Sequence, residues 1–191
     1  MDFKDHIEKV NEHRMIKTPK ILFETGLFKG GGVERSLNLF EKIYSCDIMK
    51  EFVDNAKEHF KHRHDVTILH GDSKDCLKVS LDIDQPILFY LDAHFSGGKT
   101  GGENICNGCP VLEELKVIGQ RKHKDVVIID DLRLMGVEAW SGVKDDPDAE
   151  YPYTLFDFRH ATIDNMLKAY GREVKMYQSP YPDRLILIPE N

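Results

Sequence analysis

The sequence predicts an α/β fold with a central, mostly parallel sheet of seven strands, helices on both faces and an antiparallel strand at the C-terminal end. Three observations support this prediction. Short apolar runs of strand length alternate with amphipathic segments of helical period along nearly the whole chain. The runs at 86–91 and 126–129 are apolar throughout, which is typical of strands buried on both faces. A glycine-rich turn follows the first run, and several later runs end abruptly in acid.

The composition is that of one globular domain. A typical domain has roughly 100–200 residues, so we expect a single domain over residues 1–191. No apolar run approaches the roughly 20 residues that span a bilayer, and the polar N-terminus lacks the apolar core of a signal peptide. We therefore expect a cytoplasmic protein without a membrane partner. The net charge of −7 argues against a nucleic-acid partner, because phosphate binding depends on clustered Lys and Arg.

The predicted elements alternate along the chain. Apolar residues at helical spacing predict a lead-in helix within residues 1–18. Apolar runs predict strands over residues 20–24, 42–47, 65–70, 86–91, 126–129, 173–177 and 184–188. Helical patterns predict helices over residues 33–40, 49–60, 74–79, 111–118 and 161–170. Pro110 fits the first turn of one of these helices and Gly171 fits the end of another.

Two connections are candidates for substrate-covering loops. Residues 95–109 are too rich in glycine to pack a core, so we expect them to form a mobile rim. Residues 132–160 form an unusually long connection for a compact domain. We expect acceptor specificity to come from these segments, or from a partner subunit in a homo-oligomer. Four aromatic residues of the second segment either form a wall for a sugar ring or anchor the segment: Trp140, Tyr151, Tyr153 and Phe156.

A glycine-rich turn follows the first predicted strand. Residues 24–32 read Glu-Thr-Gly-Leu-Phe-Lys-Gly-Gly-Gly and lead directly into the first predicted helix. Strand, glycine turn and helix in this order open a Rossmann-type unit, in which glycines let a ligand approach the main chain closely. The spacing differs from the Gly-x-Gly-x-x-Gly of dinucleotide sites, which argues against an NAD-dependent oxidoreductase. Asp47 lies 23 residues after Glu24, where Rossmann folds place a ribose-binding carboxylate.

Acidic residues also end the fourth and fifth predicted strands. Asp92 ends one strand, with His94 two residues further on, and Asp130 and Asp131 end the other. The carboxyl ends of parallel strands meet at one edge of a sheet, where open α/β sheets bind ligands. Three carboxylates there provide hard oxygen ligands that suit Mg²⁺ or Mn²⁺. The adjacent acids Asp130 and Asp131 could instead cap a following turn.

With these motifs the chain resembles the class I S-adenosylmethionine (SAM)-dependent methyltransferases over residues 20–188, and Glu24-Thr25-Gly26 followed by Gly30 and Gly32 is similar to their motif I. The resemblance implies a Rossmann-like sheet and SAM as cofactor. The glycine turn would hold the methionine portion, Asp47 the ribose, and Asp72 with Ser73 the adenine. As an alternative, Asp47 and Asp72 could be helix N-caps. The full implied cofactor site is Glu24, Thr25, Gly26, Gly30, Gly31, Gly32, Asp47, Ile48, Asp72, Ser73 and Asp92.

The acids after the fourth and fifth strands resemble the metal ligands of the Mg²⁺-dependent O-methyltransferases, both the catechol and the macrolide-sugar types. This resemblance implies Mg²⁺ or Mn²⁺ bound by Asp92, Asp130 and Asp131. It also implies methyl transfer to a hydroxyl of a sugar, a glycan or another small polyol. A divalent ion suits this chemistry, because it lowers the pKa of a bound hydroxyl and fixes its oxygen in line with the methyl group.

His94 is the candidate general base. Its imidazole titrates near neutral pH and could accept the hydroxyl proton, and Asp92 is the second candidate catalytic residue. A structural role for His94 in capping the loop is the alternative. Lys99 or His160 could also act as the base if the two loops bring them in.

Two further interpretations keep the same fold. One is a metal-independent methyltransferase of another acceptor, and the other is a non-catalytic nucleotide-binding module. Cys106 and Cys109 are spaced like a zinc or redox pair. A structural zinc site needs four ligands, however, and the sequence has no second such pair, so we expect two incidental thiols.

Overall fold

The computed structural model describes residues 19–146, 148–180 and 183–190. The helix predicted within residues 1–18 lies outside them. In the described part of the chain the main sheet consists of β1 (Ile21–Thr25), β2 (Lys42–Asp47), β3 (Val66–His70), β4 (Ile87–Leu91), β5 (Val126–Ile129), β8 (Val174–Pro180) and β9 (Asp183–Pro189).

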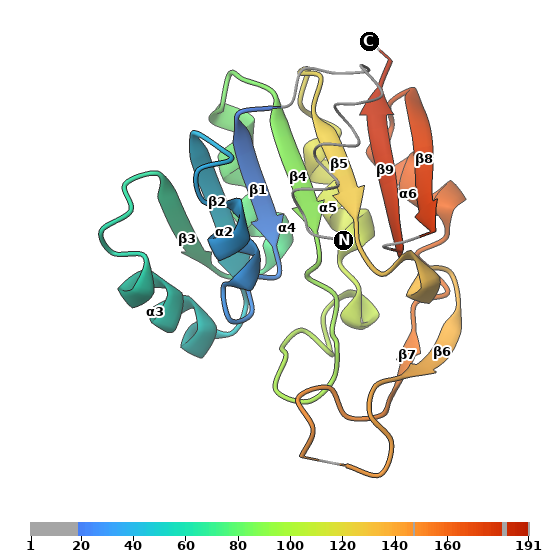
Figure 1. The fold of residues 1–191 in the computed structure, drawn as a ribbon. Helices are drawn as coiled ribbons and strands as arrows, with labels where there is room; N and C mark the ends of the chain where they lie inside the picture. Colours follow the sequence, from blue (N-terminus) through green and yellow to red (C-terminus); the bar gives the residue numbers. More distant parts are fainter. Residues whose placement is uncertain (1–18, 147, 181–182, 191) are drawn as a thin grey trace.

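The strands lie in the order β3-β2-β1-β4-β5-β9-β8 (Figure 1). Strands β1 to β5 pair with one another in parallel, whereas β9 is antiparallel to both β5 and β8. This order confirms the predicted Rossmann-like α/β fold with an antiparallel C-terminal strand. It also brings the carboxyl ends of β1, β2, β4 and β5 and the beginning of β9 to one edge of the sheet.

The helices agree with the prediction except in their bounds. They are α2 (Gly31–Ser36), α3 (Lys50–His59), α4 (Ser73–Cys76), α5 (Val111–Ile118) and α6 (Ile163–Tyr170), with 3₁₀ turns η1 (Leu77–Asp82), η2 (Cys106–Gly108) and η3 (Leu132–Leu134). The helix predicted over 33–40 stops early, because Leu37 turns to ψ 138° and Asn38 adopts a positive φ of 65°, which Asn tolerates. None of the described helices combines the length and the apolar character needed to cross a membrane.

Helices cover both faces of the sheet. Helices α2 and α3 lie on one face, and α4, α5 and α6 lie on the other (Figure 1). Side chains alternate between the two layers along each strand: Leu22 packs with α2 and α3, whereas Phe23 packs with the opposite layer. Both faces are therefore apolar cores, which explains why the strand sequences show no polar alternation.

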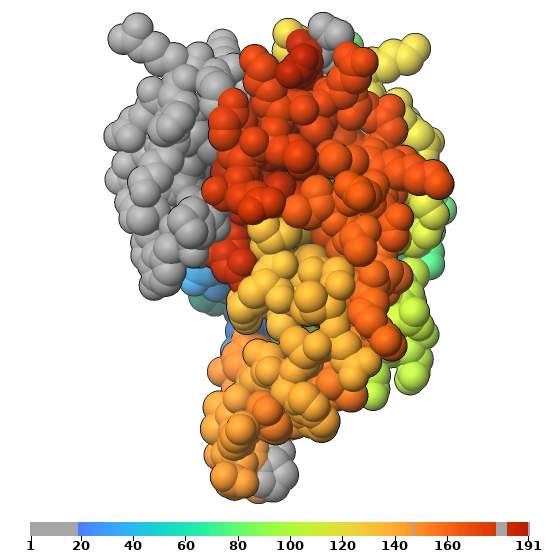
Figure 2. Space-filling model, turned by 90° about the vertical axis from the view of Figure 1, so that its right-hand side faces the viewer, coloured from blue at the N-terminus to red at the C-terminus, as the bar shows by residue number. Residues whose placement is uncertain are grey.

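The segment 132–160 contains a β-hairpin that the sequence did not predict. It pairs β6 (Glu138–Ser141) with β7 (Thr154–Asp157) in antiparallel register, so that Trp140 lies opposite Leu155. The hairpin lies beyond the carboxyl ends of the main strands (Figure 1) and projects from the body of the molecule (Figure 2). The predicted covering segment is thus a protruding arm built on a regular ladder.

Candidate active site

The glycine turn after β1 is held between the ends of β2 and β4. The backbone N–H groups of Gly26 and Leu27 both donate to the Cys46 carbonyl, at 3.0 and 2.9 Å. Gly26 has φ +86°, and a Cβ there would lie 2.1 Å from the Asp92 carbonyl oxygen. A residue without a side chain is therefore required, and the turn lies directly against the strand end that carries Asp92.

Glu24 is a buried carboxyl group at the start of this turn. Ser45 Oγ donates to Glu24 Oε2 at 2.5 Å. A Cβ on Gly32 would lie 1.7 Å from Glu24 Oε1, so the first turn of α2 packs directly on the carboxyl group. Burial raises the pKa of Glu24 to about 7, and the hydrogen bond from Ser45 offsets this rise only in part. Glu24 thus fixes the geometry of the turn as well as bordering the cavity described below.

Asp47 and Asp72 lie at the ends of the next two strands. Asp47 Oδ2 accepts from the N–H of Phe28 and Oδ1 from the N–H of Met49, both at 2.8 Å. The side chain therefore cross-links the glycine turn to the start of α3. Asp72 is the N-cap of α4, as one alternative proposed, and accepts from the N–H of Lys74 at 3.2 Å. Both side chains nevertheless border the same cavity.

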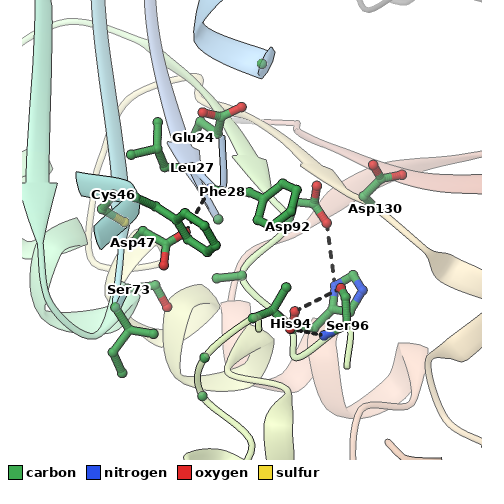
Figure 3. Close-up of a pocket in the computed structure, with 18 of the residues that line it drawn as sticks. Glu24, Leu27, Phe28, Cys46, Asp47, Ser73, Asp92, His94, Ser96 and Asp130 are labelled. Carbon is green, nitrogen blue, oxygen red and sulfur yellow. Dashed lines mark hydrogen bonds and ion pairs between the residues drawn. The ribbon is translucent and has the colours of Figure 1, made fainter. Parts of the chain in front are cut away.

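A cavity of about 570 Å³ follows this edge of the sheet (Figure 3). Its lining contains most of the predicted cofactor residues: Glu24, Gly26, Gly31, Gly32, Asp47, Ile48, Asp72, Ser73 and Asp92. Thr25 is fully buried, and Gly30 packs on Phe60 as the N-cap of α2; neither borders the cavity. The lining also includes residues that the sequence analysis did not single out: Phe28, Arg35, Phe52, Tyr90, Ile105 and Arg184.

Asp92, His94 and Asp131 form a compact cluster at one end of the cavity. His94 Nε2 lies 3.1 Å from Asp131 Oδ2, and His94 Nδ1 lies 3.6 Å from Asp92 Oδ1. One donor atom from each residue lies within 4.8 Å of the others, so among the described residues these three could hold a metal ion. The His94 ring is buried and packs edge-on against Phe158, with ring centroids 5.9 Å apart. Figure 3 shows Asp92 and His94 pointing toward one another.

The three residues of this cluster titrate differently. Burial raises the pKa of Asp92 well above its usual range, and the charges of Asp130 and Asp131 add to the rise. Burial lowers the pKa of His94, but its hydrogen bond to Asp131 and the surrounding carboxylates outweigh that effect and raise it. Burial opposes ionisation of Asp131 too, yet His94 and Arg133 lower the pKa of this carboxyl group to about 2. Asp131 is therefore the most acidic group of the cluster, whereas Asp92 and His94 both bind a proton more tightly than usual.

Asp130, a predicted metal ligand, lies outside the cluster of Asp92, His94 and Asp131 and pairs with Arg184 and Tyr90. Arg184 Nε donates to Asp130 Oδ1 at 2.9 Å, and Arg184 Nη2 donates to Tyr90 Oη at 2.6 Å. The Tyr90 hydroxyl in turn donates to Asp130. The structure thus groups His94, and not Asp130, with Asp92 and Asp131. Asp130 borders the cavity, as Asp131 does not, and as a metal ligand it would either share its oxygens with Arg184 or exchange Arg184 for the ion.

The two predicted covering segments meet above the cavity. A Cβ on Gly97 would lie 2.7 Å from Thr154 Oγ1, so residues 95–109 lie against the hairpin. Lys29 of the glycine turn forms an ion pair with Glu150 of the hairpin arm. Tyr151 borders the cavity, and its ring centroid lies 5.9 Å from that of Phe28. Their role in covering a substrate stays a prediction.

The remaining candidates lie away from the cavity. Lys99 is exposed, and His160 Nε2 lies 3.2 Å from the Cys109 carbonyl oxygen; neither residue is part of the cavity lining. All four cysteines lie in the described part of the chain and are free thiols. Cys109 is buried beside Met135, and neither Cys106 nor Cys109 is part of the described metal-binding cluster.

Glu114 of α5 is a buried carboxyl group whose titration can be tested. It is 1% exposed, Oε1 has no hydrogen-bond partner among the described residues, and burial raises its pKa to about 7. Because the folded-state pKa of Glu114 exceeds the value of 4.5 expected in the unfolded chain, the folded protein keeps a proton that the unfolded chain releases between these two values. The free energy of unfolding therefore falls as pH rises through this window.

Replacing Glu114 by Gln removes this titration. We expect Glu114→Gln to raise the free energy of unfolding at pH 8 by on the order of 2 kcal/mol relative to wild type, with little difference at pH 5. Urea denaturation at a series of pH values measures this effect. The neighbouring Glu113 is exposed and pairs with Lys116, so Glu113→Gln is the matched control and should change stability by less than about 1 kcal/mol. A difference for Glu114→Gln that does not vary with pH would contradict the assignment.

Comparison with known proteins supports the fold. No protein-family model matches the sequence, and no curated protein matches it. Among solved structures, the chain is similar to a SAM-dependent methyltransferase from Clostridium acetobutylicum (TM-score 0.53, 13% identity, covering 98% of this chain and 91% of that one). It is similar to an SAH-bound methyltransferase from Podospora anserina (TM-score 0.57, 14% identity, 96% and 75% covered). A SAM-bound amino pentose methyltransferase from Micromonospora echinaspora is also similar (TM-score 0.57, 11% identity, 97% and 89% covered). The chain therefore has the Rossmann-like fold of SAM-dependent methyltransferases.

Proposed function

We propose that the protein is a SAM-dependent methyltransferase that acts on a hydroxyl group of a sugar, a glycan or another small polyol, with a divalent cation in its active site. One observation carries the proposal. A single cavity is lined at one end by the glycine turn and Asp47, and at the other by Asp92 and His94. The predicted cofactor residues thus border the same cavity as Asp92 and His94 of the acidic cluster.

The described residues fit SAM. The cofactor, when bound, supplies a methyl group on a positively charged sulfur. A volume of about 570 Å³ lies within the range of small-molecule sites. Each carboxylate oxygen of Asp47 receives one backbone N–H, which fixes the side chain and leaves lone pairs for two vicinal hydroxyls of a ribose. Gly26, Gly31 and Gly32 bring main chain to the lining of the cavity, where a ligand can approach the backbone closely.

The described residues also fit a divalent cation. Such an ion, when bound, would lower the pKa of a substrate hydroxyl. Asp92, His94 and Asp131 would hold it, with two carboxylate oxygens and one imidazole nitrogen as donors. This mixed donor set suits Mn²⁺ better than Mg²⁺, because Mg²⁺ prefers oxygen ligands alone. Asp92 borders the cavity and is the residue of the three best placed to contact an acceptor hydroxyl.

A metal-independent methyltransferase is the second candidate, and a specific observation favours it. The ring of His94 lies between Asp92 and Asp131, and Arg184 pairs with Asp130, so each carboxylate already has a basic side chain as its partner. In this case Asp92 would accept the hydroxyl proton, because its raised pKa makes it a stronger base than an ordinary carboxylate.

Calorimetry and a methyl-transfer assay test the proposal. We expect SAM and its product S-adenosylhomocysteine (SAH) to bind at one site per chain, both with and without EDTA. We expect methyl transfer to a panel of methyl glycosides after addition of Mn²⁺, and none in excess EDTA. Failure of both SAM and SAH to bind would refute the methyltransferase assignment. Equal turnover in EDTA would establish the metal-independent candidate instead.

A further inference from the structure

The hairpin arm carries an unusual concentration of exposed apolar side chains. Among the described residues, six of the ten large apolar side chains that are exposed belong to the short stretch from 137 to 155: Val137, Trp140, Val143, Tyr151, Tyr153 and Leu155. The arm projects from the body (Figure 2), so this apolar surface has no packing role in the core. Exposed apolar surface gathered on one element indicates a binding site.

Two aromatic rings form the centre of this surface. Trp140 and Tyr153 are stacked, with ring centroids 5.0 Å apart and an interplanar angle of 21°. Lys144 Nζ lies 4.8 Å from the centroid of the Tyr153 ring, a cation–π contact. Trp140 remains 57% exposed in spite of this stacking. Its indole is therefore a supported, flat apolar platform that is open to a ligand.

The platform is continuous with the cavity. Tyr151, two residues before Tyr153 in the segment that leads into β7, borders the cavity and packs beside Phe28. The N–H of Val143 donates to the Tyr151 carbonyl at 2.8 Å, and the N–H of Tyr153 donates to the Val143 carbonyl at 2.9 Å, so this segment stays paired across the arm. An aromatic row therefore leads from the mouth of the cavity through Tyr151 to Tyr153 and Trp140. A ligand that begins at the acidic cluster and extends outward would meet this row.

Charge on the arm decides between possible occupants. Between residues 138 and 157 the sequence has six acidic residues and one basic residue, Lys144. Glu138 and Asp157 lie directly opposite one another in the ladder, next to the Trp140–Leu155 pair, and both carboxylates pair with Arg159. The arm still has an excess of negative charge, so a second copy of the chain docked here would bring two negatively charged arms together, which is repulsive. A neutral ring with an apolar C–H face and peripheral hydroxyl donors suits both the indole and the flanking carboxylates.

We propose that Trp140, supported by Tyr153, forms a subsite for the second ring of a glycoside acceptor whose first ring lies at the acidic cluster. The inference rests on the proposed function, since it deepens the assignment of a sugar acceptor: the substrate is a disaccharide or longer glycan, or a glycosylated compound, rather than a free monosaccharide. The apolar face of the second ring stacks on the indole, and its hydroxyls donate to nearby carboxylates.

The intrinsic fluorescence of the protein reports on this subsite directly, because Trp140 is the one tryptophan in the sequence. The probes are methyl glycosides of glucose, galactose, mannose and rhamnose, together with maltose, cellobiose, lactose and mannobiose. We expect at least one disaccharide to change the Trp140 emission saturably, with an affinity about 10-fold higher than that of the corresponding methyl glycoside. If none of the disaccharides changes the emission, or if the emission depends on protein concentration and not on sugar, the proposal is wrong.

Variants separate stacking from a structural effect. Tyr153→Phe keeps the supporting ring and should bind the same disaccharide as wild type does, whereas Tyr153→Leu should weaken binding several-fold; both retain the Trp140 signal. Trp140→Ala, followed by saturation-transfer NMR, should lose about 10-fold in affinity. Val137→Ala is the matched control, because Val137 is exposed on the same arm but outside the aromatic row. If Trp140→Ala and Val137→Ala bound the disaccharide with equal affinity, the proposed subsite would be wrong.

The titration requires neither SAM nor turnover, so it fails independently of the proposed function. Saturable disaccharide binding by a protein that binds neither SAM nor SAH would refute the enzymatic assignment and keep the subsite. Methyl transfer to a monosaccharide glycoside, with no effect of any disaccharide on Trp140, would keep the enzyme and refute the subsite.

Discussion

Replacing Asp92 by Asn is expected to reduce methyl transfer by on the order of 10²–10⁴-fold, the range typical for removing a group that moves a proton or holds the reacting oxygen. Asp92 is the residue of the acidic cluster that both borders the cavity and faces His94. Its backbone, not its carboxylate, abuts the glycine turn, so the affinity for SAH should be largely unchanged. Turnover assays and calorimetry with SAH measure the two quantities separately.

The matched control for this variant is Asp54→Asn. Asp54 lies on α3, where it is exposed and forms an ion pair with Lys50, and the substitution should leave turnover unchanged. If Asp92→Asn retains wild-type turnover, the acidic cluster is not part of the reaction. If it loses turnover and SAH binding together, Asp92 acts by holding the cofactor site and not on the acceptor.

The same assays distinguish Asp130 from Asp131 as a metal ligand. If the cation is held by Asp92, His94 and Asp131, Asp131→Asn should raise the Mn²⁺ concentration needed for half-maximal turnover, while Asp130→Asn should not. Asp130→Asn would instead loosen Arg184, whose guanidinium it binds. If only Asp130→Asn raised the Mn²⁺ concentration needed for half-maximal turnover, Asp130 would be a metal ligand as the sequence predicted. The ion would then displace Arg184 from it.

The fold was predictable because its signals are local. Strands β4 and β5 are uninterrupted apolar runs, and each run ends where the backbone leaves the sheet. Asp92 and Asp130 follow those ends directly and Asp47 is the last residue of β2, so the convergence of these acids on one edge required only that the strands be parallel. Helix bounds were less accurate, since a single residue such as Asn38 can end a helix by adopting a positive φ.

The grouping of side chains within the site was not predictable in the same way. Arg184 lies at the start of the antiparallel strand β9, one residue before Leu185, which pairs with Ile129 of β5. A strand that runs in the opposite direction brings its first residues, and not its last, to the ligand-binding edge. Arg184, the basic residue just before the apolar part of the C-terminal strand, was therefore the feature of the sequence that could have predicted a cationic partner for Asp130.

The hairpin arm shows a different limit. The sequence of β6 and β7 contains few β-branched residues, and an eleven-residue stretch that includes several acids separates Ser141 from Tyr153. Neither feature favours a tight hairpin. What fixes the arm is tertiary contact, including the approach of Gly97 to Thr154 and the ion pair of Lys29 with Glu150. Interactions between segments more than 50 residues apart leave no pattern in a local window of sequence.

Replacing Gly26 by Ala should destabilise the protein far more than the same substitution at Gly31 of the glycine turn. The positive φ of 86° costs a side-chain-bearing residue roughly 1–2 kcal/mol. The added Cβ would lie 2.1 Å from the Asp92 carbonyl oxygen, a backbone atom that cannot rotate away, and such overpacking costs roughly 1–3 kcal/mol more. A loss of about 3 kcal/mol corresponds to a fall in melting temperature of roughly 6–12 °C for a chain of this size.

Gly31→Ala in the same turn is the matched control for this prediction. Gly31 is the first residue of α2, and an added Cβ there would meet the flexible end of Arg35 at 3.2 Å. Since Ala is favoured over Gly in a helix by roughly 0.5–1 kcal/mol, Gly31→Ala should melt at or slightly above the wild-type temperature. The contrast between the two variants tests whether the turn is held against the end of β4. If the two variants have the same melting temperature, the close approach of Gly26 to Asp92 is wrong. The argument that the glycine turn and the acidic cluster are packed directly against one another would then be wrong too.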